Sequence, residues 1–196
     1  MNRLRLSGPG GRLPFEMDEG NWDHMTATGI RRLILTRHAK SAWDDPSMED
    51  HDRPLNDRGR KSARALGDWL ASRGYDPEEV LCSTSRRTVE TWERVAAAVF
   101  ETRPALRLED GLYHAEPDAM LDVLRSATMN TVMVIGHNPG IAAFAAMLPE
   151  RAPLDPDFRR FPTAATLVVD FPADSWGDVR PESGDVRDFV RMDGRQ

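Results

Sequence analysis

The sequence of 196 residues contains a single cysteine, Cys82. One cysteine excludes both a disulfide within the chain and a metal cluster held by cysteines, and it is compatible with the reducing cytoplasm, where we expect the protein. No apolar run approaches the ~20 residues that a membrane-spanning helix needs, so we expect no membrane association. The formal net charge of −6 argues against a general nucleic-acid-binding protein, which needs a basic surface.

The composition that remains is that of a globular protein, with 40% hydrophobic and 30% charged residues. Residues 1–29 differ from the rest, because they contain Gly8-Pro9-Gly10-Gly11 and lack the apolar stretch of a secretory signal. We predict a flexible N-terminal arm over residues 1–29 and one domain over residues 30–196. Met25 is a candidate alternative start of translation.

Strands and helices alternate along the predicted domain. Apolar runs predict strands at 32–36, 79–82, 105–108, 131–135 and 164–171, with a sixth candidate at 188–192. Amphipathic spacing and cap residues predict helices between Asn56 and Gly74, at 85–100, at 117–127, and from Asn138 to about Leu148. This alternation predicts a three-layer α/β/α sandwich with a mostly parallel central sheet.

Two of the predicted strands are followed at once by a histidine. Arg37 and His38 follow the first strand, and His137 follows the strand at 131–135. Ligands of open α/β sheets bind beyond the carboxyl ends of the strands, so the two histidines are expected to meet across one crevice. With arginines beside them, that crevice suits a phosphate ester.

Phosphoryl transfer without a metal requires three kinds of group. A histidine can act as the nucleophile and form a covalent intermediate. Arginine forks hold the phosphate oxygens, and an acid protonates the leaving group. We expect no metal and no cofactor: His51 lies among acids in the Glu49–Asp52 run, but no second ligand cluster accompanies it, which favours a solvated loop.

The segment Leu35–Trp43 reads LTRHAKSAW and resembles the signature of the histidine phosphatase (phosphoglycerate mutase-like) superfamily. It is most similar to the small bacterial SixA-type phosphohistidine phosphatases. Three later segments support the resemblance, which covers roughly residues 31–172. They are Asp52–Asn56 with Gly59, the Ser83-Arg87-Thr91 spacing, and the turn Gly136–Gly140. The resemblance implies a phosphoglycerate mutase-like fold.

The resemblance also implies roles for individual residues. His38 would be the nucleophile and become phosphohistidine. Arg37 and Arg87 would clamp phosphate oxygens, and His137 would be a fourth phosphate contact that is charged in the transition state. Ser41 would add a hydrogen bond. The helix that begins near Ser85 would favour the anion through its free N–H groups.

The acid that protonates the leaving group is the open question. Mutase relatives carry a glutamate in the segment that corresponds to Leu112–Pro117, where His114 is nearest in position and Glu116 is the nearest carboxylate. Asp44 is an outside candidate. A phosphoramidate needs less help from an acid, because its nitrogen can be protonated in advance, and this slightly favours a phosphohistidine substrate.

The resulting prediction is a metal-independent phosphatase that works through phosphohistidine on His38. Protein phosphohistidine is the first substrate choice and a small-molecule phosphate ester the second; a mutase is less favoured. The rival from another class is a non-catalytic phosphate-binding module. A cysteine phosphatase is excluded, because residue 88 is Thr where the Cys-x5-Arg motif of Cys82 would need arginine. We expect a monomer or weak dimer, with Trp43 as a candidate wall of the pocket.

Overall fold

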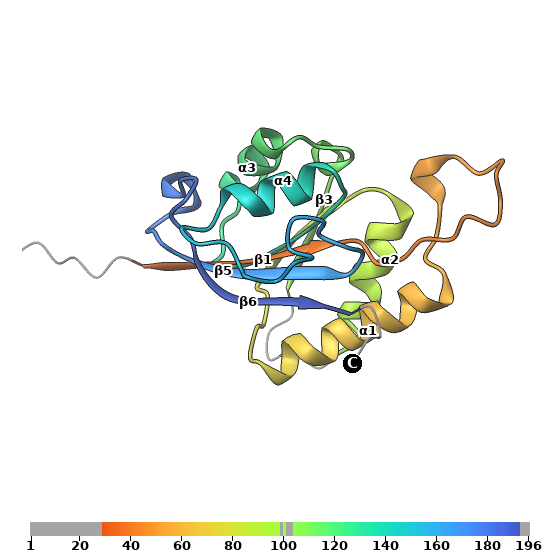
Figure 1. Cartoon of the computed structure of the whole chain (residues 1–196), viewed down its shortest axis with the longest axis horizontal. Helices are drawn as coiled ribbons and strands as arrows, with labels where there is room; N and C mark the ends of the chain where they lie inside the picture. Colours follow the sequence, from red (N-terminus) through yellow and green to blue (C-terminus); the bar gives the residue numbers. More distant parts are fainter. Residues whose placement is uncertain (1–28, 99, 101–103, 193–196) are drawn as a thin grey trace, which may run out of the picture.

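The structure is a computed structural model that describes residues 29–98, 100 and 104–192 (Figure 1). The predicted arm, apart from Gly29, lies outside the described residues, and so does Met25. Among the residues that are described, no helix is long and apolar enough to cross a membrane.

One mixed sheet of six strands forms the centre of the domain. Its order is β3-β2-β4-β1-β5-β6, and its strands are β1 (Ile30–Arg37), β2 (Glu79–Ser83), β3 (Ala105–Glu109), β4 (Thr131–Gly136), β5 (Ala165–Pro172) and β6 (Asp185–Arg191). The first four are parallel to one another, as the alternation of strands and helices predicts. The β5 strand is antiparallel to β1, and β6 is antiparallel to β5, which it follows without an intervening α-helix.

Four helices cover the two faces of the sheet (Figure 1). Those of one face are α1 (Asp57–Ser72) and α2 (Arg86–Val95), and those of the other are α3 (Pro117–Arg125) and α4 (Gly140–Met147). Ile34 packs in one buried cluster with Leu66 and Trp92, whereas Leu33 and Leu35 belong to the cluster on the opposite face. The three-layer sandwich is confirmed, and burial on both faces explains the continuous apolar run Leu33–Leu35 within β1.

The start of α1 agrees with the prediction, whereas the end of α2 and the start of α4 differ from it. The Asn56 side chain caps α1 by accepting a hydrogen bond from the Gly59 N–H at 2.8 Å, as predicted. The α2 helix ends at Val95, five residues short of the predicted end. Asn138 does not cap α4: its Oδ1, the atom that would accept from the helix, has no hydrogen-bond partner, while its Nδ2 donates to the carbonyls of Arg160 and Phe161.

The register of β1 and β4 brings the two predicted histidines together. Arg37 pairs with Gly136 at the last position of the ladder, and the His38 N–H continues it by donating to the Gly136 carbonyl at 3.1 Å. His38 and His137 therefore leave adjacent strands at the same edge of the sheet.

Two glycines allow helices to approach the segments that carry the site. A Cβ on Gly59 at the start of α1 would lie 2.1 Å from the Lys40 carbonyl oxygen. A Cβ on Gly140 at the start of α4 would lie 1.8 Å from the carbonyl oxygen of Ala115. Both contacts are with backbone, so a side chain could enter only by displacing the chain next to His38 or His114.

We expect Gly140→Ala to lower the free energy of unfolding by at least ~1–3 kcal/mol, the usual cost of an added methyl group in a closed site. Gly111→Ala is the matched control, because its Cβ would meet only Val123 Cγ2 at 3.7 Å. Urea unfolding measures both. Equal midpoints for the two variants would contradict the close approach of α4 to the His114 segment.

Candidate active site

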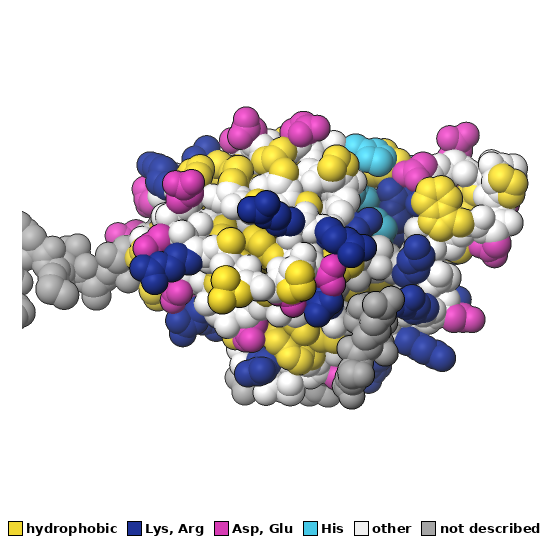
Figure 2. All heavy atoms as spheres, viewed as in Figure 1, with side chains coloured by type: hydrophobic (Ala, Val, Ile, Leu, Met, Phe, Trp, Pro, Cys, Tyr) yellow, Lys and Arg dark blue, Asp and Glu magenta, His cyan; other side chains and the backbone are white. Residues whose placement is uncertain are grey.

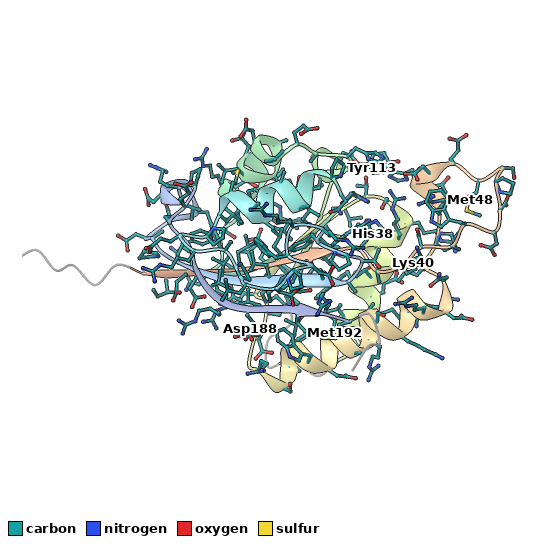
Figure 3. The ribbon with its side chains drawn as sticks, in the orientation of Figure 1. His38, Lys40, Met48, Tyr113, Asp188 and Met192 are labelled. Carbon is teal, nitrogen blue, oxygen red and sulfur yellow. The ribbon has the colours of Figure 1, made fainter. Side chains whose placement is uncertain are left out.

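A pocket of about 240 Å³ lies at the carboxyl ends of β1 and β4. Six of the residues singled out from the sequence line it: Arg37, His38, Ser41, Arg87, His114 and His137. Figure 2 shows histidines beside Lys and Arg side chains in a recess next to a projecting loop, and Figure 3 places His38 and Lys40 at that end of the sheet. The predicted crevice is therefore present.

His38 is held as a neutral imidazole with one nitrogen free. Its Nδ1 lies 2.7 Å from the Ala39 carbonyl oxygen. A carbonyl only accepts, so Nδ1 carries the proton and Nε2 keeps its lone pair. Burial, with the charges of Arg87 and Arg37 adding to it, lowers the pKa of His38 to about 3. At neutral pH the ring is in the form that a nucleophile requires.

His137 lies against His38, with the ring centroids 5.1 Å apart. Its Nδ1 accepts from the Arg87 guanidinium at 3.3 Å, so its Nε2 carries the proton and donates to Ser83 Oγ at 2.8 Å. Burial, with the neighbouring His38 and the charge of Arg87 adding to it, lowers the pKa of His137 to about 2. A phosphoryl group in the pocket would offset the arginine charge and favour a second proton on His137.

Three arginines converge on the pocket, and the Nε atom of each is buried without a hydrogen-bond partner. They are Arg37, Arg53 and Arg87. Burial, followed by repulsion from Arg87, lowers the pKa of Arg37. Buried guanidinium groups with unmet donors favour an anion, and planar forks suit phosphate oxygens. The sequence assigned no role to Arg53, which it named only as part of a family segment.

Asp50 is a residue of the pocket that the sequence did not reveal. Its Oδ2 accepts from Arg87 at 2.9 Å and from the Tyr113 hydroxyl at 2.8 Å, and its Oδ1 lies 3.3 Å from Arg53. Burial would raise the pKa of Asp50, but the Tyr113 hydrogen bond and the Arg87 charge lower it to about 2. Asp50 is thus an ionised counterion, and the only signal for it was its position three residues before Arg53.

His51 lies beside Asp50 in the same loop. The sequence favoured a solvated loop over a metal site, and the His51 side chain is 43% exposed. Its Nε2 lies 3.2 Å from Thr84 Oγ1, and its ring packs edge-on against Tyr113 with the centroids 5.0 Å apart. No group of three His, Cys, Asp or Glu in the described ranges could hold a metal ion.

The motif Ser83-Arg87-Thr91 has a structural explanation. Ser83 ends β2 and orients His137, while Arg87 lies in the first turn of α2 and lines the pocket. Thr91, one turn later, donates to the Arg87 carbonyl and accepts from the Ala39 N–H at 3.0 Å. The spacing thus ties the arginine to both histidine segments.

The candidate acids separate clearly. His114 lines the pocket, with its Nε2 3.5 Å from Asp50 Oδ2 and its ring centroid 5.8 Å from that of His137. Glu116 is exposed at the N-cap of α3, and the structure does not bring it into the pocket. Asp44 lines a neighbouring cavity instead. Ser41 is buried in the pocket, and its Oγ accepts from Arg53 at 3.2 Å.

Comparison with known proteins gives a consistent family. The model of the histidine phosphatase superfamily (branch 1) matches residues 33–112. An uncharacterized chloroplastic protein of Arabidopsis thaliana is 35% identical over 60% of this chain and 59% of its own length, so the chain spans well under two thirds of that relative. An uncharacterized protein of Mycobacterium tuberculosis is 34% identical over 74% of this chain and 92% of its own length.

Similar solved structures point to the same family. SixA from Nakamurella multipartitia, which bears the name of a phosphohistidine phosphatase, is 29% identical with a TM-score of 0.69, and the match covers 83% of this chain and 96% of that one. SixA from Agrobacterium tumefaciens is 29% identical with a TM-score of 0.66 over 82% and 97% of the two chains. The phosphoglycerate mutase-like fold is confirmed by these matches. With two histidines and three arginines at one edge of that fold, the chain belongs to the histidine phosphatase superfamily, branch 1, and its structure is SixA-like.

Proposed function

We propose that this protein is a metal-independent phosphatase that passes a phosphoryl group through His38, and that its substrate is phosphohistidine on a protein. The observation that carries the proposal is the state of His38: a buried, neutral imidazole whose Nδ1 is fixed by the Ala39 carbonyl and whose Nε2 is free beside three arginines. A basic but unprotonated nitrogen among buried cations suits attack on phosphorus.

The reaction has two steps. In the first, His38 Nε2 forms a bond to phosphorus while the bond to the leaving nitrogen breaks, and the leaving group takes a proton. In the second, water forms a bond to phosphorus, the bond to Nε2 breaks, and inorganic phosphate and neutral His38 return. Arg37, Arg53 and Arg87 hold the equatorial oxygens, where their charge stabilises the transition state.

The choice of phosphohistidine over an ester rests on the acids present. Asp50 has a pKa of about 2, so it is ionised at neutral pH and holds no proton to give. His114 is the remaining candidate in the pocket, and its side chain is 56% exposed. A phosphoramidate nitrogen can be protonated by solvent before it leaves, so a site with weak acid assistance favours it. The SixA likeness supports the same choice.

Two alternatives remain open to test. A small-molecule phosphate ester is favoured by His114, if that imidazole acts as the acid. A phosphate-binding module without turnover is favoured by Asp50, because its carboxylate already occupies donors of Arg87. Such a module would bind phosphate analogues without forming a covalent intermediate.

We expect the wild-type protein to become labelled on His38 when it is mixed with a phosphohistidine peptide labelled on the phosphoryl group and quenched in base. Mass spectrometry locates the label, and EDTA should not reduce turnover. His38→Ala should carry no label and show no turnover while its circular dichroism is unchanged. Tight vanadate binding without a label in the wild type would support the binding module instead.

Arg87→Ala should weaken vanadate binding about 10- to 100-fold, the effect of losing one charge-assisted hydrogen bond in a buried site. Arg86→Ala is the matched control, because the Arg86 side chain is 56% exposed and pairs with Glu90 at 3.0 Å. Isothermal titration measures both affinities. Equal affinities in the two variants would remove Arg87 from the phosphate site.

His114→Ala should slow hydrolysis of an alkyl phosphate, a poor leaving group, but by less than the ~100-fold that a well-placed general acid contributes, because the His114 side chain is 56% exposed. Its effect on a phosphoramidate should be much smaller. Glu116→Gln should leave both rates unchanged, because Glu116 lies outside the pocket. Slower ester hydrolysis in Glu116→Gln, or no effect of His114→Ala, would refute the assignment of the acid.

A further inference from the structure

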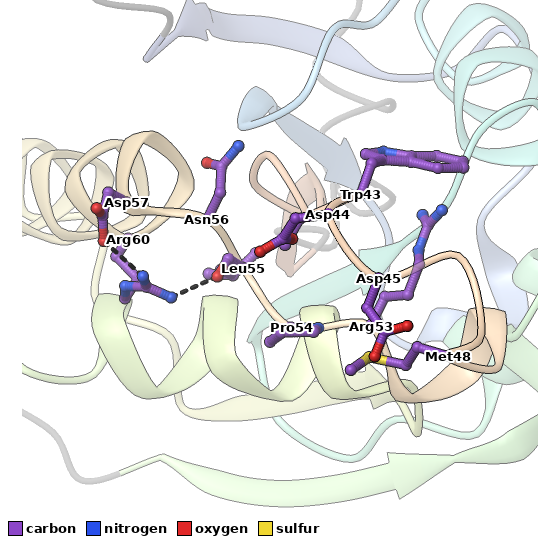
Figure 4. A pocket seen from close by; sticks show the side chains of 11 residues that line it. Trp43, Asp44, Asp45, Met48, Arg53, Pro54, Leu55, Asn56, Asp57 and Arg60 are labelled. Atoms are coloured by element: carbon purple, nitrogen blue, oxygen red, sulfur yellow. Dashed lines mark hydrogen bonds and ion pairs between the residues drawn. The ribbon is translucent and has the colours of Figure 1, made fainter.

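A second and larger cavity, of about 680 Å³, adjoins the phosphate pocket and shares Trp43 and Arg53 with it. The residues around this cavity come from the loop after Ser41 and from the segment that leads into α1 (Figure 4). No residue that we assign to the chemistry lines it apart from the shared Arg53.

We propose that this outer cavity holds the polypeptide around the phosphorylated residue of the substrate, and that it selects a lysine or arginine next to that residue. The inference rests on the proposed function, because it assigns the substrate of the same site. It names a class of substrate: phosphorylated protein segments with cationic neighbours.

The volumes of the two cavities suit different parts of a protein substrate. The inner pocket, at about 240 Å³, is smaller than the ~300–1,000 Å³ of typical small-molecule sites. It accommodates a phosphoryl group and the side chain bonded to it. The rest of a protein substrate lies outside this pocket, and the outer cavity adjoins it at Trp43 and Arg53.

The shared wall is built for contact with a ligand. Trp43 is 72% exposed, and the Arg53 guanidinium carbon lies 3.4 Å from the centroid of its ring (Figure 4). The Arg53 side chain is only 10% exposed, and its Nε has no hydrogen-bond partner. An exposed indole on a fixed cation is a large apolar surface that a bound peptide would cover.

Charge changes sign from the inner pocket to the outer cavity. The inner pocket gathers Arg37, Lys40, Arg53 and Arg87 against the single carboxylate of Asp50. Three aspartates and two arginines line the outer cavity: Asp44, Asp45, Asp57, Arg60 and the shared Arg53. The Arg60 guanidinium is engaged by Asp57 at 2.5 Å, which leaves Asp44 and Asp45 on the loop.

The two loop carboxylates are available to a cation. Asp44 makes no ion pair with any residue that the structure describes, and Asp45 accepts only from Ser47 and Met48 groups in its own turn. Asp44 directly follows Trp43, which lines both cavities.

A cationic pocket next to the carboxylates of Asp44 and Asp45 suits a substrate whose phosphoryl group is flanked by a positive charge. A phosphoryl group enters the cationic pocket, and a neighbouring lysine or arginine meets Asp44 and Asp45. A small polyanion, with a second phosphate or a carboxylate, would instead place its extra negative charge against these aspartates. Charge complementarity therefore favours a basic protein segment over a polyanionic metabolite.

The test uses two phosphohistidine peptides that differ only in the residues beside the phosphohistidine, lysine in one and glutamate in the other. We expect the wild-type kcat/KM to be about 5- to 10-fold higher for the lysine peptide. This is the size expected when lysine forms partly exposed ion pairs with Asp44 and Asp45 and glutamate is repelled by them. This ratio should shrink as salt is raised. The double variant Asp44→Asn, Asp45→Asn should bring the ratio close to one.

Two further variants complete the test. Asp44→Asn alone breaks no ion pair among the described residues. It should reduce the logarithm of the lysine-to-glutamate ratio of kcat/KM by about half. Asp122→Asn is the matched control, because Asp122 is an exposed carboxylate on α3, paired with Arg125, and should keep the wild-type ratio. The same loss in Asp122→Asn would overturn the proposal, since it would show an effect of net charge.

Turnover of free phosphoramidate separates this proposal from the proposed function. Turnover with a lysine-to-glutamate ratio near one in the wild type would overturn the outer-cavity proposal and leave the phosphatase intact. Faster turnover of a polyanionic phosphate ester than of the lysine peptide would overturn it in favour of a metabolite. Absence of phosphoramidate turnover in every variant would refute the proposed function itself.

Discussion

Burial of a cluster of cations is the constraint on which the site depends. Arg37, Arg53 and Arg87 share one small pocket with a single carboxylate, Asp50. Burial removes the water that would stabilise a second proton on either histidine, and the charge of Arg87 opposes that proton as well, so the pKa of His38 falls to about 3 and that of His137 to about 2. The proposed nucleophile is thus kept neutral chiefly by burial, with the arginines that suit phosphate adding to the effect.

The same buried charges make the site sensitive to an anion. Asp50 is the partner that Arg87 and Arg53 share, and Tyr113 fixes its orientation. A phosphoryl group would add negative charge at the same donors, so Asp50 would have to share or yield them. His137, whose Nδ1 accepts from Arg87, would then be able to hold a second proton. Binding itself would produce the charged His137 that the family resemblance implies.

The parts of this arrangement that could be predicted from sequence are those fixed by regular structure. Parallel pairing of β1 with β4 places His38 beside His137, and helical spacing places Arg87 and Thr91 one turn apart on α2. Asp50 could not be predicted, because its place depends on how an irregular loop folds over α2. The choice between His114 and Glu116 turned on backbone geometry that sequence does not show: His114 has a φ of 52°, which directs the chain around the pocket before α3 begins.

The same irregular loop also supplies the acidic side of the outer cavity. Residues 42–54 carry Trp43, Asp44, Asp45 and Asp50, so one loop supplies both the counterion of the arginine pocket and the acidic side of the outer cavity. A cationic interior attracts any phosphate and cannot by itself tell one from another. Discrimination must come from what lies beside the phosphoryl group, and there the loop presents carboxylates that penalise a second negative charge. In this proposal the cationic inner pocket carries out catalysis and the acidic outer cavity selects the substrate. Arg53 and Trp43, which stack on each other, line both.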